Sequence, residues 1–160
     1  MRMPIELLVK RYKDNLFSVA FNICKNAQDE EDIVQETYLK YIKSEQEFEN
    51  EQHIKAWLLR VAINQSKNMM LSFWKRNYVA FQDYMQELSF ETQEDSLLFE
   101  AVMSLPRKYR IVLHLFYYED YSVGEISEIL HINENTIKSQ LARGRKLLKE
   151  KMMEAWNEDE

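Results

Sequence analysis

The shortage of glycine and proline limits the possible folds of this chain more than any other feature, because 2 of each occur among 160 residues. Sandwiches and barrels join their strands by many tight turns, and those turns depend on these two residue types. Apolar residues make up 46% of the chain, which is enough for a packed core. The sequence therefore favours an all-α fold and argues against an all-β fold.

Several classes of function are excluded by what the sequence lacks. It has one cysteine, Cys24, and no cluster of cysteine and histidine with the spacing of metal ligands. It also has no phosphate-binding loop, zinc motif or nucleophile elbow. No apolar run reaches the roughly 18 residues of a membrane span, and no secretory pattern opens the chain. We therefore expect a cytoplasmic protein without stable membrane insertion, which is not an enzyme and uses no metal or cofactor.

The distribution of charge matters more than the formal net charge of -6. Residues 77–100 hold six acids and no base, whereas residues 133–153 hold six bases and two acids. A basic segment thus lies inside an acidic chain, and local charge is what meets phosphate. The overall acidity does not exclude binding to nucleic acid.

The same charge shift divides the chain into two parts. Residues 77–91 carry no base and lose helical periodicity, so we predict an acidic linker there. It joins two small helical domains, residues 1–76 and residues 92–160. In the second domain, Thr92 is a candidate N-cap for a helix, and further helices are predicted over about 123–130 and 134–153.

The first domain contains two segments with helical periodicity, about 29–43 and 54–71, separated by a polar loop over 44–53. Asp29 is the candidate N-cap of the first helix. One side of that helix is predicted to face the core through Ile33, Val34, Tyr38, Tyr41 and Ile42. The opposite side carries Asp32, Gln35, Glu36 and Leu39, which form either a solvated surface or a partner surface. In the second helix, Trp57 falls on the apolar face beside a stripe of Arg60, Asn64 and Lys67.

Residues 122–145 have the pattern of a helix-turn-helix. Ile126 and Ile129 give the first helix an apolar face, and the short break at 131–133 has His131 as a candidate left-handed residue. Asn133 is a candidate cap for the second helix, whose exposed polar side chains are of the kinds that contact base edges and phosphates. A helical hairpin with a merely solvated basic face has the same periodicity. The exposed polar residues of the second helix are Lys138, Ser139, Gln140, Arg143, Arg145, Lys146 and Lys149.

Two sequence blocks carry a resemblance to a known family. SLPRKYRIVLHLFYYEDYSVGEISEILHINENTIKSQLARGRKLL (104–148) closely resembles region 4 of bacterial extracytoplasmic-function (ECF) sigma factors. DEEDIVQETYLKYI (29–42) resembles their region 2.2, and HIKAWLLRVAINQSKN (53–68) their regions 2.3 to 2.4. The departures from the family pattern bear on which promoter sequence is read. They are His131 and Asn135 in place of Gly, Gln140 in place of Arg, and Gly144 in place of Ala.

The resemblance implies a two-domain initiation factor whose partners are core RNA polymerase, promoter DNA and an anti-sigma factor. It implies that Asp32, Gln35, Glu36 and Leu39 bind core polymerase. The loop 44–53 and the side chains of Arg60, Asn64, Lys67 and Asn68 are the implied contacts to the −10 element. The implied contacts to the −35 element are Lys138, Ser139, Gln140, Arg143, Arg145 and Lys146. The alternative is a helix-turn-helix transcriptional regulator with an N-terminal helical interaction domain.

Overall fold

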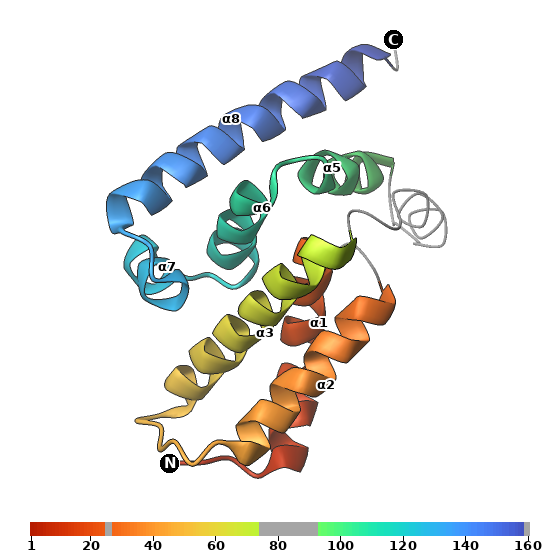
Figure 1. Cartoon of the computed structure of the whole chain (residues 1–160). Coiled ribbons are helices and arrows are strands. Elements are labelled where there is room, and N and C mark those ends of the chain that lie inside the picture. Colours follow the sequence, from red (N-terminus) through yellow and green to blue (C-terminus); the bar gives the residue numbers. More distant parts are fainter. Residues whose placement is uncertain (25–26, 74–92, 159–160) are drawn as a thin grey trace. The chain divides into compact units, whose positions relative to one another are not determined.

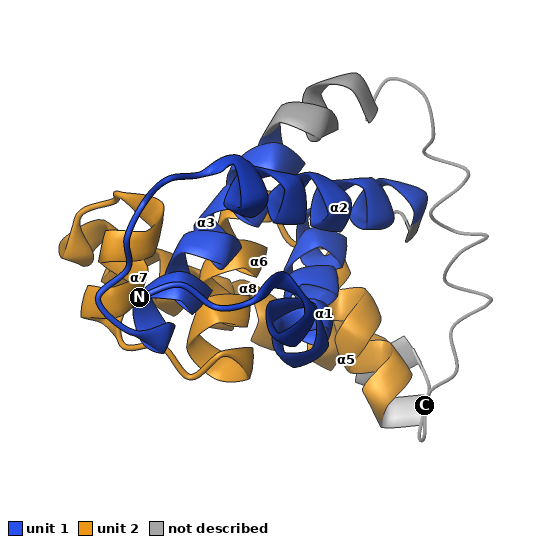
Figure 2. Ribbon diagram, turned by 90° about the horizontal axis from the view of Figure 1, so that it is seen from below, with its two compact units in different colours: residues 1–86 blue, residues 87–160 orange. Residues whose placement is uncertain are grey.

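The structure is a computed structural model that describes residues 1–24, 27–73 and 93–158, and within these ranges every regular element is a helix (Figure 1). The predicted all-α fold is confirmed. The chain forms two compact units, unit 1 (residues 1–86) and unit 2 (residues 87–160), shown in Figure 2. The predicted linker at 77–91 and the predicted cap Thr92 lie outside the described residues. No helix in the described ranges is both long and apolar enough to cross a membrane.

Unit 1 is a three-helix arrangement of α1 (Ile5–Cys24), α2 (Ala27–Lys43) and α3 (Glu51–Phe73), in which each helix packs against the other two. The sequence predicts the second and third helices with slightly shorter bounds, and gives no bounds for the first. Cys24 is buried at the end of α1, as its apolar neighbours indicate. The largest fully buried side chains of the unit are Leu8, Leu16, Ile23, Ile33, Ile54, Leu58, Leu59 and Ile63.

The core face of α2 differs from the prediction at one position. Ile33, Val34 and Tyr41 are buried, but Ile42 is 55% exposed. At 100° per residue, Ile42 lies opposite Ile33 on the helix, too far round to reach the core. The middle of the buried face is instead Thr37, which is fully buried. Its hydroxyl donates to the carbonyl of Ile33 at 2.8 Å, so the buried hydroxyl has a hydrogen-bond partner.

Unit 2 is organised around its long last helix. Its elements are α5 (Gln93–Met103), α6 (Arg107–Leu113), the π-helical turn η1 (His114–Tyr118), α7 (Val123–Leu130) and α8 (Glu134–Glu158). Helix α8 packs against α5, α6 and α7. The predicted bounds of α7 are confirmed, whereas α8 continues five residues beyond the predicted end at 153. Apolar side chains buried in this unit include Leu105, Ile111, Val112, Leu115, Ile126, Ile137 and Leu141.

Candidate functional site

The first helix of the predicted helix-turn-helix, α7, begins and ends with local hydrogen bonds. Its N-cap Ser122 and Glu125 form a capping box, in which each side chain accepts from the other's backbone N–H at 3.1 and 3.0 Å. At the other end His131 has a left-handed backbone, with φ 54° and ψ 45°, as the sequence predicts. The hydroxyl of Ser127 donates to the carbonyl of Ile132 at 2.5 Å and closes the turn. These contacts fix the direction in which the chain enters α8.

The second helix, α8, begins at the predicted cap. The Asn133 side-chain oxygen accepts from the backbone N–H of Asn135 at 2.8 Å and of Thr136 at 3.3 Å. Ile137 and Leu141 are buried. A Cβ on Gly144 would lie 3.3 Å from side-chain atoms of both Tyr109 and Leu113, so glycine permits a close approach to α6. The opposite side of α8 is therefore presented to solvent.

Most of the predicted DNA-contacting side chains of α8 are exposed, but they are not equivalent. Lys138, Ser139, Arg143 and Lys146 are all exposed. Arg145 is also exposed, yet its guanidinium donates to the hydroxyl of Tyr117 in η1 at 3.0 Å. Arg145 therefore lies on a flank of the helix and is held there by η1.

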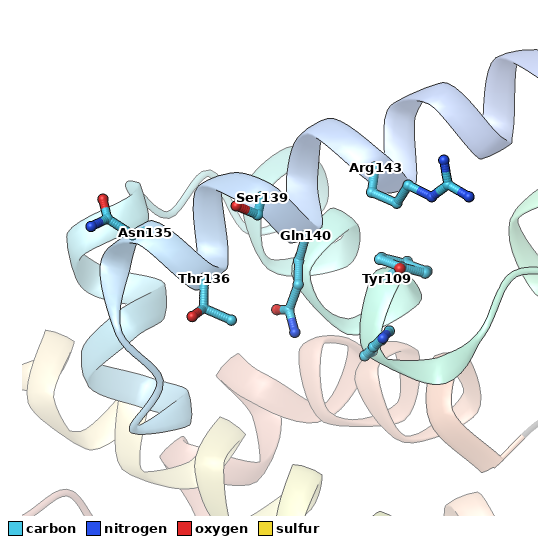
Figure 3. Close-up of a pocket in the computed structure, with 7 residues that line it drawn as sticks. Tyr109, Asn135, Thr136, Ser139, Gln140 and Arg143 are labelled. Atoms are coloured by element: carbon cyan, nitrogen blue, oxygen red, sulfur yellow. The ribbon is translucent and has the colours of Figure 1, made fainter.

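A cleft of about 500 Å³ lies between the N-terminal part of α8 and the start of α6 (Figure 3). Three of the predicted side chains, Ser139, Gln140 and Arg143, line it together with two residues of α6 that the sequence reasoning missed, Lys108 and Tyr109. Gln140 is half-buried, and its side-chain oxygen is buried without a hydrogen-bond partner. Neutral amide, hydroxyl and cationic donors thus meet in one open cleft. The remaining lining residues are Asn135 and Thr136.

The predicted polymerase-binding residues of α2 form one exposed stripe. Asp32, Gln35, Glu36 and Leu39 are all exposed, and 44% of the Leu39 surface is accessible. The exposed Ile42 lies three residues after Leu39, so the stripe has a larger apolar part than the sequence predicts. The stripe thus combines two exposed apolar side chains with two carboxylates and an amide.

A half-buried acid lies in the first turn of the same helix. Burial raises the pKa of Glu30 to about 7, and one of its carboxylate oxygens is buried without a hydrogen-bond partner. Burial also raises the pKa of Asp29, with a further contribution from the charge of Asp32. Because its pKa lies near 7, Glu30 weakens the anionic character of the start of α2 near neutral pH.

The predicted −10 contacts lie on α3 and on the loop that precedes it. Arg60 and Asn64 are exposed one turn apart, and Lys67 is half-buried. Asn68 is part of α3, but its side chain lies outside what the structure describes. The loop is shorter than predicted, residues 44–50, because α3 begins at Glu51.

The start of α3 is tied to α1. The hydroxyl of Tyr12 donates to the Glu51 carboxylate at 2.6 Å, and the Arg11 guanidinium forms an ion pair with the same carboxylate. Hydrogen bonds from these two side chains lower the pKa of Glu51. A carboxylate in the first turn of a helix is also favoured by the helix dipole. The end of the loop is thus fixed by contacts from a distant part of the chain.

The geometry holds no feature of a metal site in the part of the chain that the structure describes, where no three His, Cys, Asp or Glu side chains are grouped to hold an ion. The arrangement instead offers two separate surfaces on two units. Unit 1 has the exposed stripe on α2 and the exposed Arg60 and Asn64 on α3, and unit 2 has the basic, cleft-bearing face of α8.

Comparison with known proteins gives matches to both units. The family model of sigma-70 region 2 matches residues 8–77, and that of sigma-70 region 4 matches residues 96–148. The RNA polymerase sigma factor SigV of Bacillus subtilis is 29% identical over 140 residues, covering 86% of this chain and 84% of SigV. The ECF RNA polymerase sigma factor SigW of the same organism is 27% identical over 162 residues, covering 91% of this chain and 87% of SigW.

A solved structure shows the same fold. The sigma factor RpoE from Bartonella quintana, crystallised in complex with the anti-sigma factor NepR, superposes with a TM-score of 0.72. The match covers 92% of this chain and 96% of RpoE at 21% sequence identity. The agreement extends over both units.

Proposed function

Because the chain belongs to the sigma-70 family and is a sigma factor of the ECF type, we propose that unit 1 binds core RNA polymerase and the −10 element and that unit 2 reads the −35 element. The observation that supports this assignment of −35 recognition to unit 2 is the exposed basic face of α8, which belongs to a capped helix-turn-helix. This is the geometry with which a recognition helix enters a major groove. Unit 1 has no such element among its described residues, but has the exposed stripe of α2.

The experiment that tests this function is run-off transcription with core RNA polymerase on a promoter library, with and without the protein. A sigma factor makes initiation by the core enzyme depend on promoter sequence. A helix-turn-helix regulator, the alternative class, would not start transcription with core enzyme alone. Run-off products that are the same with and without the protein would contradict the proposal.

Within unit 2, we assign contacts to the bases of the −35 element to the side of α8 that lines the cleft. We assign contacts to the phosphates to exposed side chains farther along the helix. Arg143 lines the cleft and can fork onto a guanine edge, whereas Lys149 is exposed farther along the helix. Arg143→Ala should cost about 1–3 kcal/mol and relax the preference at one −35 position. The matched variant Lys149→Ala should weaken all sequences alike and reduce the salt slope by about one unit. Unchanged preference with lowered affinity in Arg143→Ala would make Arg143 a phosphate contact, and no change in either would contradict the groove-facing orientation.

The cleft adds Lys108 to the proposed −35 surface. Its side chain is exposed at the start of α6, across the cleft from Arg143, and an ammonium group acts as a point charge toward phosphate. Lys108→Ala should therefore weaken −35 binding without changing sequence preference. Arg145, which is held by Tyr117, should have a smaller effect than Arg143. Promoter binding in the presence of core polymerase, measured at several salt concentrations, checks both expectations.

The stripe of α2 is the proposed contact to core polymerase. Asp32→Ala combined with Gln35→Ala removes two exposed polar groups, and a lost interfacial hydrogen bond costs about 1–3 kcal/mol where it leaves a partner unpaired. Association with core polymerase should weaken while helicity stays intact. Glu31→Ala, an exposed acid at the edge of the stripe, is the matched control. Equal retention of core polymerase by the double variant and the wild type would remove the stripe from the interface.

The proposal also includes a cytoplasmic location, where core polymerase and promoter DNA are found in bacteria, and regulation by an anti-sigma factor. The crystallised complex of RpoE with NepR supports the second part by fold similarity. An anti-sigma factor for this chain would suppress promoter-dependent run-off in the assay above, and would compete with core polymerase for the protein.

A further inference from the structure

Most side chains of the loop 44–50 of unit 1 are exposed, but one aromatic ring of the loop is buried and anchors it. Glu45, Gln46 and Glu49 are exposed, whereas Phe48 is 3% exposed. The Phe48 ring stacks on Tyr41 with centroids 6.0 Å apart, and the Trp57 ring meets it edge-on at 5.7 Å. The loop therefore presents polar side chains from a backbone fixed at one point.

A second anchor comes from the start of the chain, residues 1–3, here called the N-terminal strap. The Arg2 guanidinium lies over the Tyr41 ring, 4.5 Å from its centroid, and donates to the Tyr41 carbonyl at 2.7 Å and the Gln46 carbonyl at 2.8 Å. The backbone N–H of Met3 donates to the Tyr41 hydroxyl at 2.8 Å, and that hydroxyl donates to the Met3 carbonyl at 2.8 Å. The Phe48 N–H also donates to the strap, at the Met1 carbonyl.

The position of Arg2 at the end of α2 explains why an arginine suits these contacts. The last carbonyls of a helix have no partner within the helix, and Tyr41 lies in the last turn of α2. A cation at that end is favoured by the helix dipole. The planar fork of an arginine spans two carbonyls at once, one in the helix and one in the loop, which a lysine ammonium cannot match in geometry. Arg2 thus links the end of α2 to the middle of the loop.

We propose that Arg2 is a positioning residue, which holds the loop 44–50 in the shape in which it reads the −10 element. The proposal rests on the −10 reading proposed above for unit 1, for which this loop is one of the predicted contacts. Reading the −10 element with a loop that is mobile in the free protein would require ordering that loop at the moment of binding. The strap orders the loop in the free protein, so binding energy is not lost in that step.

The test compares Arg2→Ala and Arg2→Lys with Lys10→Ala, which removes an exposed cation from α1. Hydrogen exchange of the full-length free protein should be about tenfold faster over residues 44–50 in Arg2→Ala than in the wild type. With core polymerase and a library randomised at −10, the ratio of initiation from the best to the worst sequence should fall about tenfold. Preference in a library randomised at −35 should be unchanged, and Lys10→Ala should match the wild type in all three assays.

Arg2→Lys separates positioning from simple charge attraction. It keeps the charge but loses the fork, so it should behave like Arg2→Ala. Full rescue by lysine would overturn the proposal, because Arg2 would then be attracting phosphate. Unchanged exchange over 44–50 in Arg2→Ala would overturn it as well.

A loop variant distinguishes failure of the strap from failure of the loop's proposed function. The triple change Glu45→Ala, Gln46→Ala and Glu49→Ala replaces exposed side chains but leaves the backbone contacts of the strap. If it alters −10 preference and Arg2→Ala does not, the strap proposal is wrong and the loop assignment stands. If it leaves −10 preference unchanged, the loop does not read the −10 element, and both fail.

Discussion

The turn between α7 and α8 and the loop between α2 and α3 both lie beside a proposed DNA-reading surface, but they are stabilised differently. The turn is held by residues within five positions of one another, through the Ser127–Ile132 and Asn133–Thr136 contacts. The loop has near contacts too, but it also depends on residues about forty positions away, through Arg2 and Tyr12. The turn should therefore survive perturbation elsewhere in its unit, whereas the loop depends on the packing of all of unit 1.

The largest expected effect of this difference is at the buried anchor of the loop. Phe48→Ala removes a ring that contacts Tyr41, His53 and Trp57, and such a change costs about 3–5 kcal/mol. Equilibrium unfolding of the full chain, with hydrogen exchange to locate the change, should show destabilisation throughout unit 1 and none in unit 2. A cost below about 1 kcal/mol would mean that the loop is not coupled to the core of its unit.

The two units should respond to pH in opposite directions. In unit 2 burial lowers the pKa of His114 to about 4. The contribution of this side chain to the stability of the folded unit is therefore fully present above its ordinary pKa of 6.5, and it is lost as the pH falls toward 4. Between pH 7 and pH 5 this loss is of order 2 kcal/mol. In unit 1 the pKa of Glu30 is raised to about 7. The contribution of this side chain to the stability of the folded unit is therefore fully present below its ordinary pKa of 4.5, and it is lost as the pH rises toward 7.

Hydrogen exchange at pH 7 and pH 5, corrected for intrinsic rates, checks this opposition in one sample. Protection from exchange should fall in unit 2 on acidification. In unit 1 it should rise, because Glu30 becomes protonated. Glu30→Gln should remove that contribution and leave unit 2 unchanged. A fall of protection in both units on acidification would contradict the assignment of Glu30, and a rise in both would contradict that of His114.

A smaller effect is expected from the local contacts of the turn. Asn133→Ala removes the acceptor for two N–H groups at the start of α8 and should destabilise unit 2 by about 1 kcal/mol. Asn135→Ala is the matched control, since Asn135 contributes its backbone and not its side chain to the cap. Denaturant unfolding of the full chain measures both. Equal costs for the two variants would mean that the cap does not stabilise the turn.

The smallest effect concerns the two glycines of unit 2. A Cβ on Gly124 would meet the end of the flexible Glu134 side chain at 3.0 Å, whereas a Cβ on Gly144 would meet Tyr109 and Leu113 of α6 at 3.3 Å. Alanine in place of a helical glycine gains about 0.5–1 kcal/mol when nothing resists it. Gly124→Ala should therefore be more stabilising than Gly144→Ala. The reverse order of midpoints in denaturant would show that α6 yields more easily than Glu134.

The same contrast explains what could be predicted from the sequence. His131 and Asn133 were identifiable because a left-handed residue and a cap are determined by their immediate neighbours, and the structure confirms both. The prediction that Ile42 faces the core was wrong, because Ile42 lies half a turn round the helix from Ile33, beyond the edge of the buried face. Nothing local to the loop marks Arg2 as its partner.

The cleft of unit 2 escaped prediction for a related reason. Lys108 and Tyr109 precede Gln140 by about thirty residues and meet it only because α6 crosses α8 at Gly144. The π-helical turn η1, which brings Tyr117 to Arg145, has no distinct apolar period in the sequence. Helix α8 could therefore be predicted, but its surroundings could not.

We claim that the two units read two different promoter elements, and promoter selection can separate them. Promoter selection from a library randomised at both elements is carried out with core polymerase and the wild type, Asn64→Ala or Arg143→Ala. We predict that Asn64→Ala changes the selected −10 sequence alone and that Arg143→Ala changes the selected −35 sequence alone. Selection in which either variant changes the other element, or in which both change the same element, would contradict the claim.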